Sequence, residues 1–170
     1  MSMLQTLHRY IIPAAWSVLP PTMGTPPATA LLLAIAQQES DGVTARRQYG
    51  RGPARGFWQF EPIGVRGVYA HPAVQPALYQ ALTQLRYKWD GFGPKQAYQV
   101  VEHNDVLAAV LARLLLWTLP DRLPGPSESA QAWHQYLAAW RPGKPHLDTW
   151  HGYYTHAWKL VDGAQEATHG

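Results

Sequence analysis

The chain has 170 residues, of which 46% are hydrophobic and 15% are charged, so it can bury one compact core and is not a disordered chain. It carries 14 Lys and Arg against 11 Asp and Glu, and this small positive balance does not by itself indicate a nucleic-acid-binding protein. The absence of cysteine excludes disulfides, thiolate nucleophiles and cysteine-bound zinc. Eight Trp and nine Tyr favour a dense aromatic core or a groove for flat ligands such as sugars.

Residues 1–24 predict an amphipathic helix followed by a loop. Pro13 either ends this helix or bends it on its way to Leu19. The pair His8-Arg9 precedes an apolar run, as in a secretion signal, but Pro13 interrupts the run and no Ala-x-Ala cleavage site follows. We therefore expect no cleaved signal, and the location of the protein stays open. No segment reaches the roughly 20 apolar residues that span a bilayer, so no membrane span is expected.

Residues 25–39 predict the central helix of the domain. Thr25 is a typical N-cap and Pro26 follows it at the first helical position. The run Leu31–Ala36 is apolar all round, which indicates a helix that is buried on every side. We expect this helix to end just after Glu39, where Gly42 offers a terminator.

The segment 42–56 predicts an exposed loop or a short irregular hairpin, which is the minimal β element that we expect. It is rich in Gly and Pro, and it carries four arginines, Arg46, Arg47, Arg51 and Arg55. Such a cluster either attracts anionic polymers or belongs to an ordinary solvated loop.

Helical segments follow along the rest of the chain. We expect them at about 57–63, 72–89, 104–119 with Asn104 as its cap, 127–140 and 147–161, with a disordered tail at 163–170. The prediction is one mainly α domain spanning residues 1–170, with its core between about residues 25 and 161.

Glu39 stands out among the carboxylates. It lies at the end of the helix that we expect to be most buried, where partial burial and the negative end of the helix dipole both disfavour a charged side chain. Both effects raise the pKa of a carboxyl, as a proton donor near neutral pH requires. Its position alone also fits a solvated glutamate in a last helical turn. Glu39 is therefore a candidate general acid.

A second block, Pro53-Ala54-Arg55-Gly56-Phe57-Trp58-Gln59, follows Glu39-Ser40 after the arginine-rich loop. Together the two blocks resemble the lysozyme-like superfamily, in particular its lytic transglycosylases and goose-type lysozymes, and more loosely their phage-encoded members. In that group a helix ends in Glu-Ser, and Gly-Ala-x-Gly-Leu-Met-Gln follows after a loop. Here Pro53 replaces the first Gly, Phe57 the Leu and Trp58 the Met.

A third segment adds to the resemblance. Residues 138–143, Ala-Ala-Trp-Arg-Pro-Gly, lie where the family carries Ala-Tyr-Asn-Ala-Gly. Trp140 replaces the Tyr and Arg141 the Asn, and the second change puts a site role for Arg141 in doubt.

The resemblance implies cleavage of the β-1,4 bond between N-acetylmuramic acid and N-acetylglucosamine in peptidoglycan. Glu39 would be the general acid and then the base, and a lytic transglycosylase would release 1,6-anhydro-muropeptides. The motif set lies closer to the transglycosylases. The alternative is a hydrolytic muramidase in which Glu61 is a second acid that holds a water molecule, unless Glu61 is solvated and idle. A further alternative is a non-catalytic lysozyme-like module that binds glycan or assembles into a phage particle or secretion machine.

The same resemblance implies a substrate groove lined by Ser40, Gly56, Trp58, Gln59 and Trp140. Ser40 would orient Glu39 or the substrate, and the Gln59 amide suits acetamido and hydroxyl groups. Gly56 allows close approach of a ligand or of a neighbouring helix, while the two tryptophans stack on sugars or belong to the core. The expected partners are peptidoglycan strands, with lysis or a phage or secretion machine as the route to the wall, and neither a metal nor another cofactor is expected.

Overall fold

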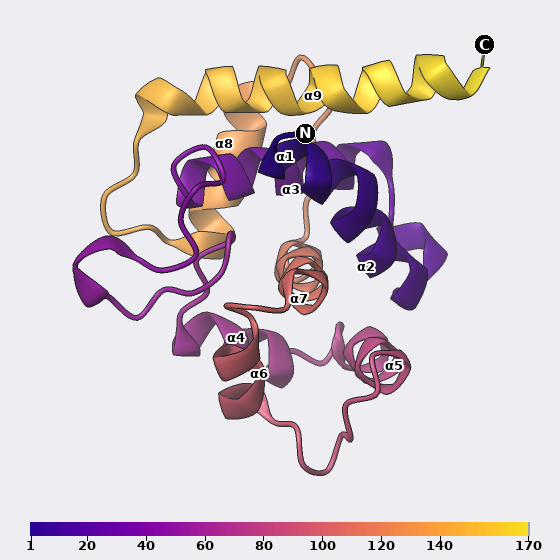
Figure 1. Ribbon diagram of the computed structural model, residues 1–170, viewed down its shortest axis with the longest axis vertical. Helices are drawn as coiled ribbons and strands as arrows, with labels where there is room; N and C mark the ends of the chain where they lie inside the picture. The colour runs from indigo at the N-terminus through magenta and orange to yellow at the C-terminus, as the bar shows by residue number, and fades with distance from the viewer. Residues whose placement is uncertain (170) are drawn as a thin grey trace.

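Helix α3 (Pro26–Glu39) forms the buried centre of the fold in a computed structural model that describes residues 1–169. Its N-cap is Thr25, whose side chain accepts a hydrogen bond from the backbone N–H of Ala28, as predicted. All side chains from Ala30 to Ala36 are fully buried. Because the middle of α3 has no polar face, other helices enclose it, and Figure 1 shows α9 lying across one end of the molecule directly over α3.

The N-terminal segment continues through Pro13 instead of ending there. It consists of α1 (Met3–Thr6), a π-helical turn at Leu7–Ile11 and α2 (Ile12–Val18). Pro13 lies in the first turn of α2, where its missing N–H is tolerated. The wider π turn before it accommodates the break in the regular hydrogen-bond ladder.

A second group of helices extends from the middle of the molecule, where α7 lies, to the end opposite α9 (Figure 1). It comprises α4 (Pro62–Ala70), α5 (Gln75–Gln84), α6 (Pro94–Val100) and α7 (Asp105–Trp117). The Asn104 cap of α7 is confirmed, because its side chain accepts a hydrogen bond of 3.0 Å from the N–H of Leu107.

Two predicted helices in this region were wrong in extent. Residues 57–59 form a turn, and α4 begins only at Pro62, because Gln59 has a φ of 47° that cannot continue a right-handed helix. The predicted helix 72–89 is shortened to α5, since Arg86 has a φ of 67°. Helix α6 lies inside a stretch for which no helix was predicted.

The last two helices are α8 (Ser129–Trp140) and α9 (Leu147–His169). The predicted disordered tail at 163–170 was wrong as far as residue 169, and residue 170 lies outside the described residues. Residues 162–167 have no apolar stripe, which is the pattern that predicts an amphipathic helix. Their side chains are all exposed in the structure. Alanine, glutamine and glutamate nevertheless favour helix, and α9 continues past the body of the molecule (Figure 1).

The β structure is minimal, as predicted. Over residues 1–169 it consists of isolated antiparallel bridges that join Arg47 to Arg55 and Arg55 to Phe60. The mainly α fold class is therefore confirmed. Within the same range, the helices are too short or too polar to cross a bilayer.

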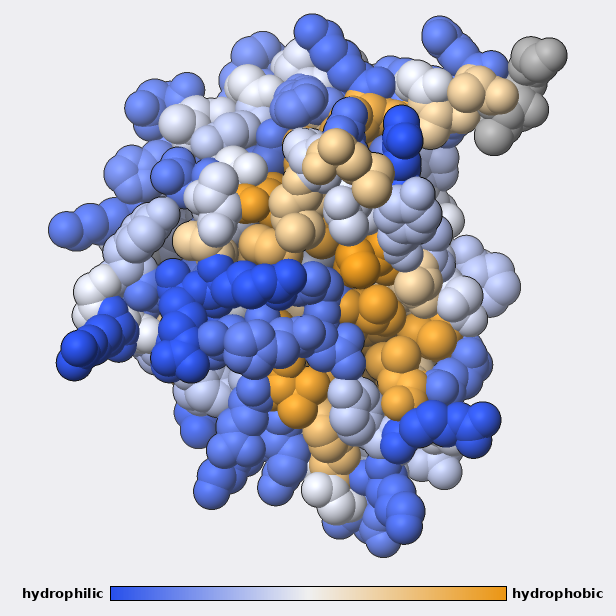
Figure 2. Space-filling model, in the orientation of Figure 1, coloured by the Kyte–Doolittle hydropathy of each residue, from blue (hydrophilic) through white to orange (hydrophobic). Residues whose placement is uncertain are grey.

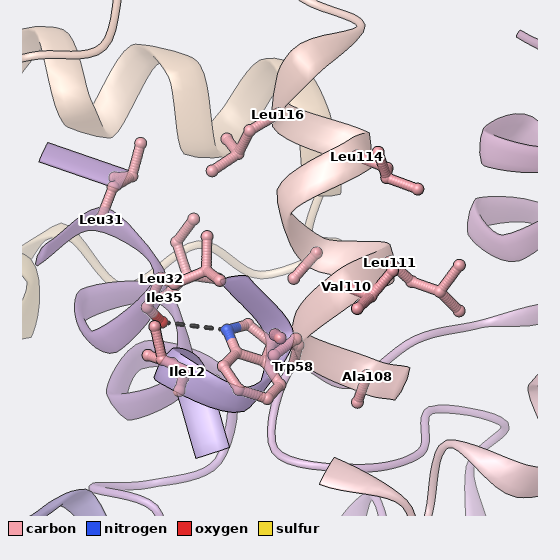
Figure 3. Packing of buried hydrophobic residues seen from close by; sticks show 14 of the residues in the cluster. Ile12, Leu31, Leu32, Ile35, Trp58, Ala108, Val110, Leu111, Leu114 and Leu116 are labelled. Carbon is pink, nitrogen blue, oxygen red and sulfur yellow. Dashed lines mark hydrogen bonds between the residues drawn. The ribbon is translucent and has the colours of Figure 1, made fainter. Parts of the chain in front are cut away.

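Trp58 connects the turn at residues 57–59 to the central helix. Its side chain has no exposed surface, and its indole Nε1–H donates a hydrogen bond of 2.9 Å to the carbonyl of Leu32. Figure 3 shows the ring between α3 and α7. The second sequence block is thus fixed directly to α3, whose last residue is Glu39.

Candidate active site

A cleft of about 1110 Å³ opens at the C-terminal end of α3. Its walls come from the end of α3, from the segment leading into α4 and α4 itself, from the end of α7, and from α8 with the loop that follows it. The structure brings four of the predicted site residues together on these walls: Glu39, Gln59, Glu61 and Trp140.

Glu39 is half-buried at the edge of this cleft. Its Oε1 accepts a hydrogen bond of 2.6 Å from the hydroxyl of Tyr136. Burial raises the pKa of the Glu39 carboxyl to about 7, the Tyr136 hydrogen bond opposes this rise, and the charge of Glu61 adds to it. Near neutral pH the carboxyl is therefore present in both protonation states, so it can donate a proton and later accept one.

Tyr136 is a site residue that the sequence reasoning missed. It lies on α8 with its ring stacked on Trp150, at a centroid distance of 5.2 Å and an interplanar angle of 13°. Burial and the neighbouring Glu39 raise the pKa of its hydroxyl, so the group stays a proton donor in the hydrogen bond to Glu39. The signal in the sequence was the aromatic spacing Trp133, Tyr136, Trp140, which marks one face of α8.

Glu61 provides a second carboxylate on the cleft wall. It occupies the N-cap position of α4, a place where a side-chain carboxylate often accepts a hydrogen bond from the helix. Here the side chain makes no capping hydrogen bond and is exposed. The Glu61 carboxylate is thus free to contact a ligand in the cleft, and its negative charge raises the pKa of Glu39.

Gln59 and Trp140 both line the cleft, and a hydrogen bond holds each of them in place. The Gln59 amide donates a hydrogen bond of 2.8 Å to the carbonyl of Gly56, which holds the side chain in the turn. Trp140 Nε1–H donates to the carbonyl of Trp58 at 2.8 Å, and its ring lies 6.1 Å from that of Phe60. The indole of Trp140 is therefore fixed in place while part of its surface faces the cleft.

Three predicted groove residues do not line the cleft. Of the two alternatives for Trp58, a place in the core holds and stacking on a sugar does not, because its ring is wholly buried. The Ser40 hydroxyl is also buried and donates to the carbonyl of Ala36 at 2.5 Å, so it bonds to its own helix instead of orienting Glu39. Gly56, with a φ of 73°, approaches the Val101 carbonyl so closely that an added Cβ would lie 2.6 Å from the oxygen. Its close neighbour is the end of α6 and not a ligand.

The arginine cluster of residues 46–55 is largely neutralised within the protein. Arg46 donates two hydrogen bonds to Asp105, at 2.5 and 2.8 Å. Arg47 and Arg55 contact the two carboxylate oxygens of Glu102 at 2.6 and 3.4 Å. The hydrogen bond from Arg47, followed by the charges around it, lowers the pKa of Glu102. Figure 2 shows a strongly hydrophilic surface on the side of the molecule where this loop lies in Figure 1. These contacts fasten the loop to the connection between α6 and α7.

Across residues 1–169, His, Asp and Glu side chains do not gather in any group of three that could hold a metal ion. Comparisons of the chain with models of protein families, with curated proteins and with solved structures find no match.

Proposed function

We propose that this protein cleaves peptidoglycan at the β-1,4 bond between N-acetylmuramic acid and N-acetylglucosamine, as a lytic transglycosylase with Glu39 as general acid and base. The observation that carries the proposal is a glutamate whose pKa is raised to about 7 on the wall of a cleft of about 1110 Å³. A cleft of this size accommodates several sugar rings. The motif resemblance of the two blocks around Glu39 and Gln59 supplies the substrate class.

In the proposed reaction Glu39 acts twice, first as a proton donor and then as a proton acceptor. The protonated carboxyl donates to the bridging oxygen as the glycosidic C–O bond breaks, and positive charge develops on the muramyl ring. The resulting carboxylate then removes the proton of the muramyl 6-hydroxyl, whose oxygen closes the 1,6-anhydro ring. Glu39 thereby returns to its protonated state without consuming water. Positioned acid–base catalysis of this kind contributes about 10² to 10⁴ in rate.

Hydrolysis is the second candidate reaction, and Glu61 favours it. Inverting glycosidases place two carboxyl groups on either side of the scissile bond, with space for a water molecule between them. Glu61 lies on the wall of the same cleft as Glu39 and is exposed. In this reaction Glu61 would activate water, and the product would carry a reducing end instead of an anhydro ring.

The test is Glu39→Gln, assayed on purified cell walls by the release of soluble muropeptides and by mass spectrometry of the products. We expect the rate to fall at least about 100-fold while the thermal unfolding transition is retained. Glu166→Gln is the matched control, because this exposed glutamate lies on α9 away from the cleft.

The products separate the candidate functions. Anhydro-muropeptides from the unmodified protein support transglycosylation, and reducing ends support hydrolysis. A Glu39→Gln protein that still solubilises walls would remove Glu39 from the mechanism. An unmodified protein that binds walls without clearing them would identify a non-catalytic glycan-binding module.

A further inference from the structure

The loop between α8 and α9 lines the cleft with basic side chains. Arg141, Lys144 and His146 all contribute to the wall, and all three are exposed. Within residues 1–169, the ion pairs leave Arg141 and Lys144 without a carboxylate partner. The arginine and the lysine that line the cleft both lie on this loop, whereas Arg46, Arg47 and Arg55 are paired with carboxylates.

This loop is held in place beside the catalytic end of α3. Gln38, the residue before Glu39, donates from its amide to the carbonyl of His146 at 2.9 Å. The Thr149 hydroxyl lies 3.0 Å from Gln38 Oε1 and 3.1 Å from the same His146 carbonyl. The basic side chains are therefore carried by a backbone whose position is tied to that of Glu39.

Arg141 occupies a backbone position that suits glycine. It caps α8 in the left-handed conformation with a φ of 49°, where glycine or asparagine is usual because a larger side chain is disfavoured. The cation is thus present on the cleft wall despite an unfavourable backbone conformation. Residues in disfavoured backbone conformations cluster at ligand-binding sites, so the backbone of Arg141 favours a role in ligand binding.

We infer that the loop at residues 141–146 binds carboxylates of the peptide attached to the muramyl lactyl group, so that the cleft selects peptide-bearing strands over bare glycan. The inference rests on the proposed function, because it takes the substrate in the cleft to be peptidoglycan. An arginine fork and a lysine ammonium are well suited to carboxylates. Glu61, on the α4 wall of the cleft, repels them, so the charges also set the direction in which the strand lies.

The experiment compares two soluble ligands: glycan strands with their peptides, and the same strands after an amidase has removed the peptides, which leaves one lactyl carboxylate on each muramyl residue in place of the several carboxylates of the peptide. Binding is measured at low salt with the full chain carrying Glu39→Gln, so that turnover does not change the ligand. We expect the peptide-bearing strand to bind roughly tenfold more tightly, and we expect added salt to reduce this preference.

The decisive variant combines Arg141→Gly with Lys144→Gln. Glycine suits the left-handed backbone at position 141, so the loss of the cation is separated from a loss of folding, which thermal unfolding verifies. The preference should fall to about twofold. The control, Lys95→Gln with Lys159→Gln, removes two exposed charges outside the cleft and should keep the preference.

The possible failures are distinguishable. Equal binding of both strands, or a preference that survives Arg141→Gly with Lys144→Gln, overturns the inference and leaves the proposed function in place. If the unmodified protein binds the strands with the expected preference but cleaves neither, the inference stands and the proposed enzymatic function is wrong. If neither strand binds, both are wrong.

Discussion

The protonation state of Glu39 is set by a dominant effect and two smaller ones that oppose each other. Burial is the largest cause of the raised pKa, the hydrogen bond from Tyr136 lowers it, and the charge of Glu61 raises it. Tyr136 therefore does more than hold the side chain in place, because a donor to the carboxylate also makes the proton easier to lose. A general acid is active only while it is protonated, so its activity declines as the pH rises through its pKa.

Tyr136→Phe should shift the alkaline limb of the pH profile of kcat/KM to higher pH. Without the hydroxyl, the Glu39 carboxylate loses a hydrogen bond, its pKa rises, and the proton is kept at a pH where the unmodified protein has lost it. The rate at low pH should fall less than about 100-fold, because Glu39 itself remains. Tyr10→Phe, at an exposed tyrosine on the N-terminal segment, is the control. A Tyr136→Phe profile with an unmoved limb would show that the hydrogen bond does not act on the proton.

Glu61→Gln should shift the same limb in the opposite direction. Removal of the negative charge makes the Glu39 carboxylate easier to form, so its pKa falls and activity declines at a lower pH. In the proposed transglycosylase, anhydro products persist with only this shift. If the variant instead loses all activity at every pH, Glu61 is the base of a hydrolytic reaction.

At the scale of the elements, Gly56 determines how closely the second block packs against α6. Its φ of 73° and the 2.6 Å separation between an added Cβ and the Val101 oxygen mean that alanine meets both backbone strain and a steric clash. We expect Gly56→Ala to lower the free energy of unfolding by about 3 kcal/mol. Urea denaturation measures this quantity.

The matched control for Gly56→Ala is Gly152→Ala. Gly152 lies within α9, and an added Cβ would meet nothing within 4 Å. Alanine there should raise the free energy of unfolding by about 0.5 to 1 kcal/mol. Equal effects at the two glycines would contradict the close approach of Gly56 to α6.

The elements that the sequence predicted well are those with local signals. The caps at Thr25 and Asn104 act within one helical turn, and the apolar run of α3 can be recognised without knowledge of its neighbours. The ends of α5 and of the turn before α4 depend instead on the left-handed backbone of Arg86 and Gln59. Neither residue type demands that conformation, because tertiary packing imposes it, so the sequence pattern did not reveal it.

At the scale of the whole molecule, the cleft combines segments that are far apart in the chain. Glu39 was predicted from its place at the end of the apolar helix and from a motif that resembles those of a family, and Gln59 and Trp140 were predicted from such motifs alone. Neither signal depends on knowing the packing. The hydrogen bond between Tyr136 and Glu39 joins residues 97 positions apart. Helical periodicity identifies the face on which Tyr136 lies, but it does not identify the helix that this face meets.

Trp58 links the fold to the site, and its replacement tests that link. Its Nε1–H binds the Leu32 carbonyl in α3, while its own carbonyl accepts the hydrogen bond from Trp140 on the cleft wall. Trp58→Phe removes the first bond and leaves a cavity in the core, so the free energy of unfolding should fall by about 2 to 3 kcal/mol. Trp89→Phe, at a tryptophan that is 41% exposed, should change it by less than about 1 kcal/mol. Because the Trp58 ring has no exposed surface, the folded fraction of Trp58→Phe should keep the affinity for glycan strands that the proposed function implies. A variant of unchanged stability and weakened glycan binding would instead place this ring in the groove, where the sequence motif alone had allowed it.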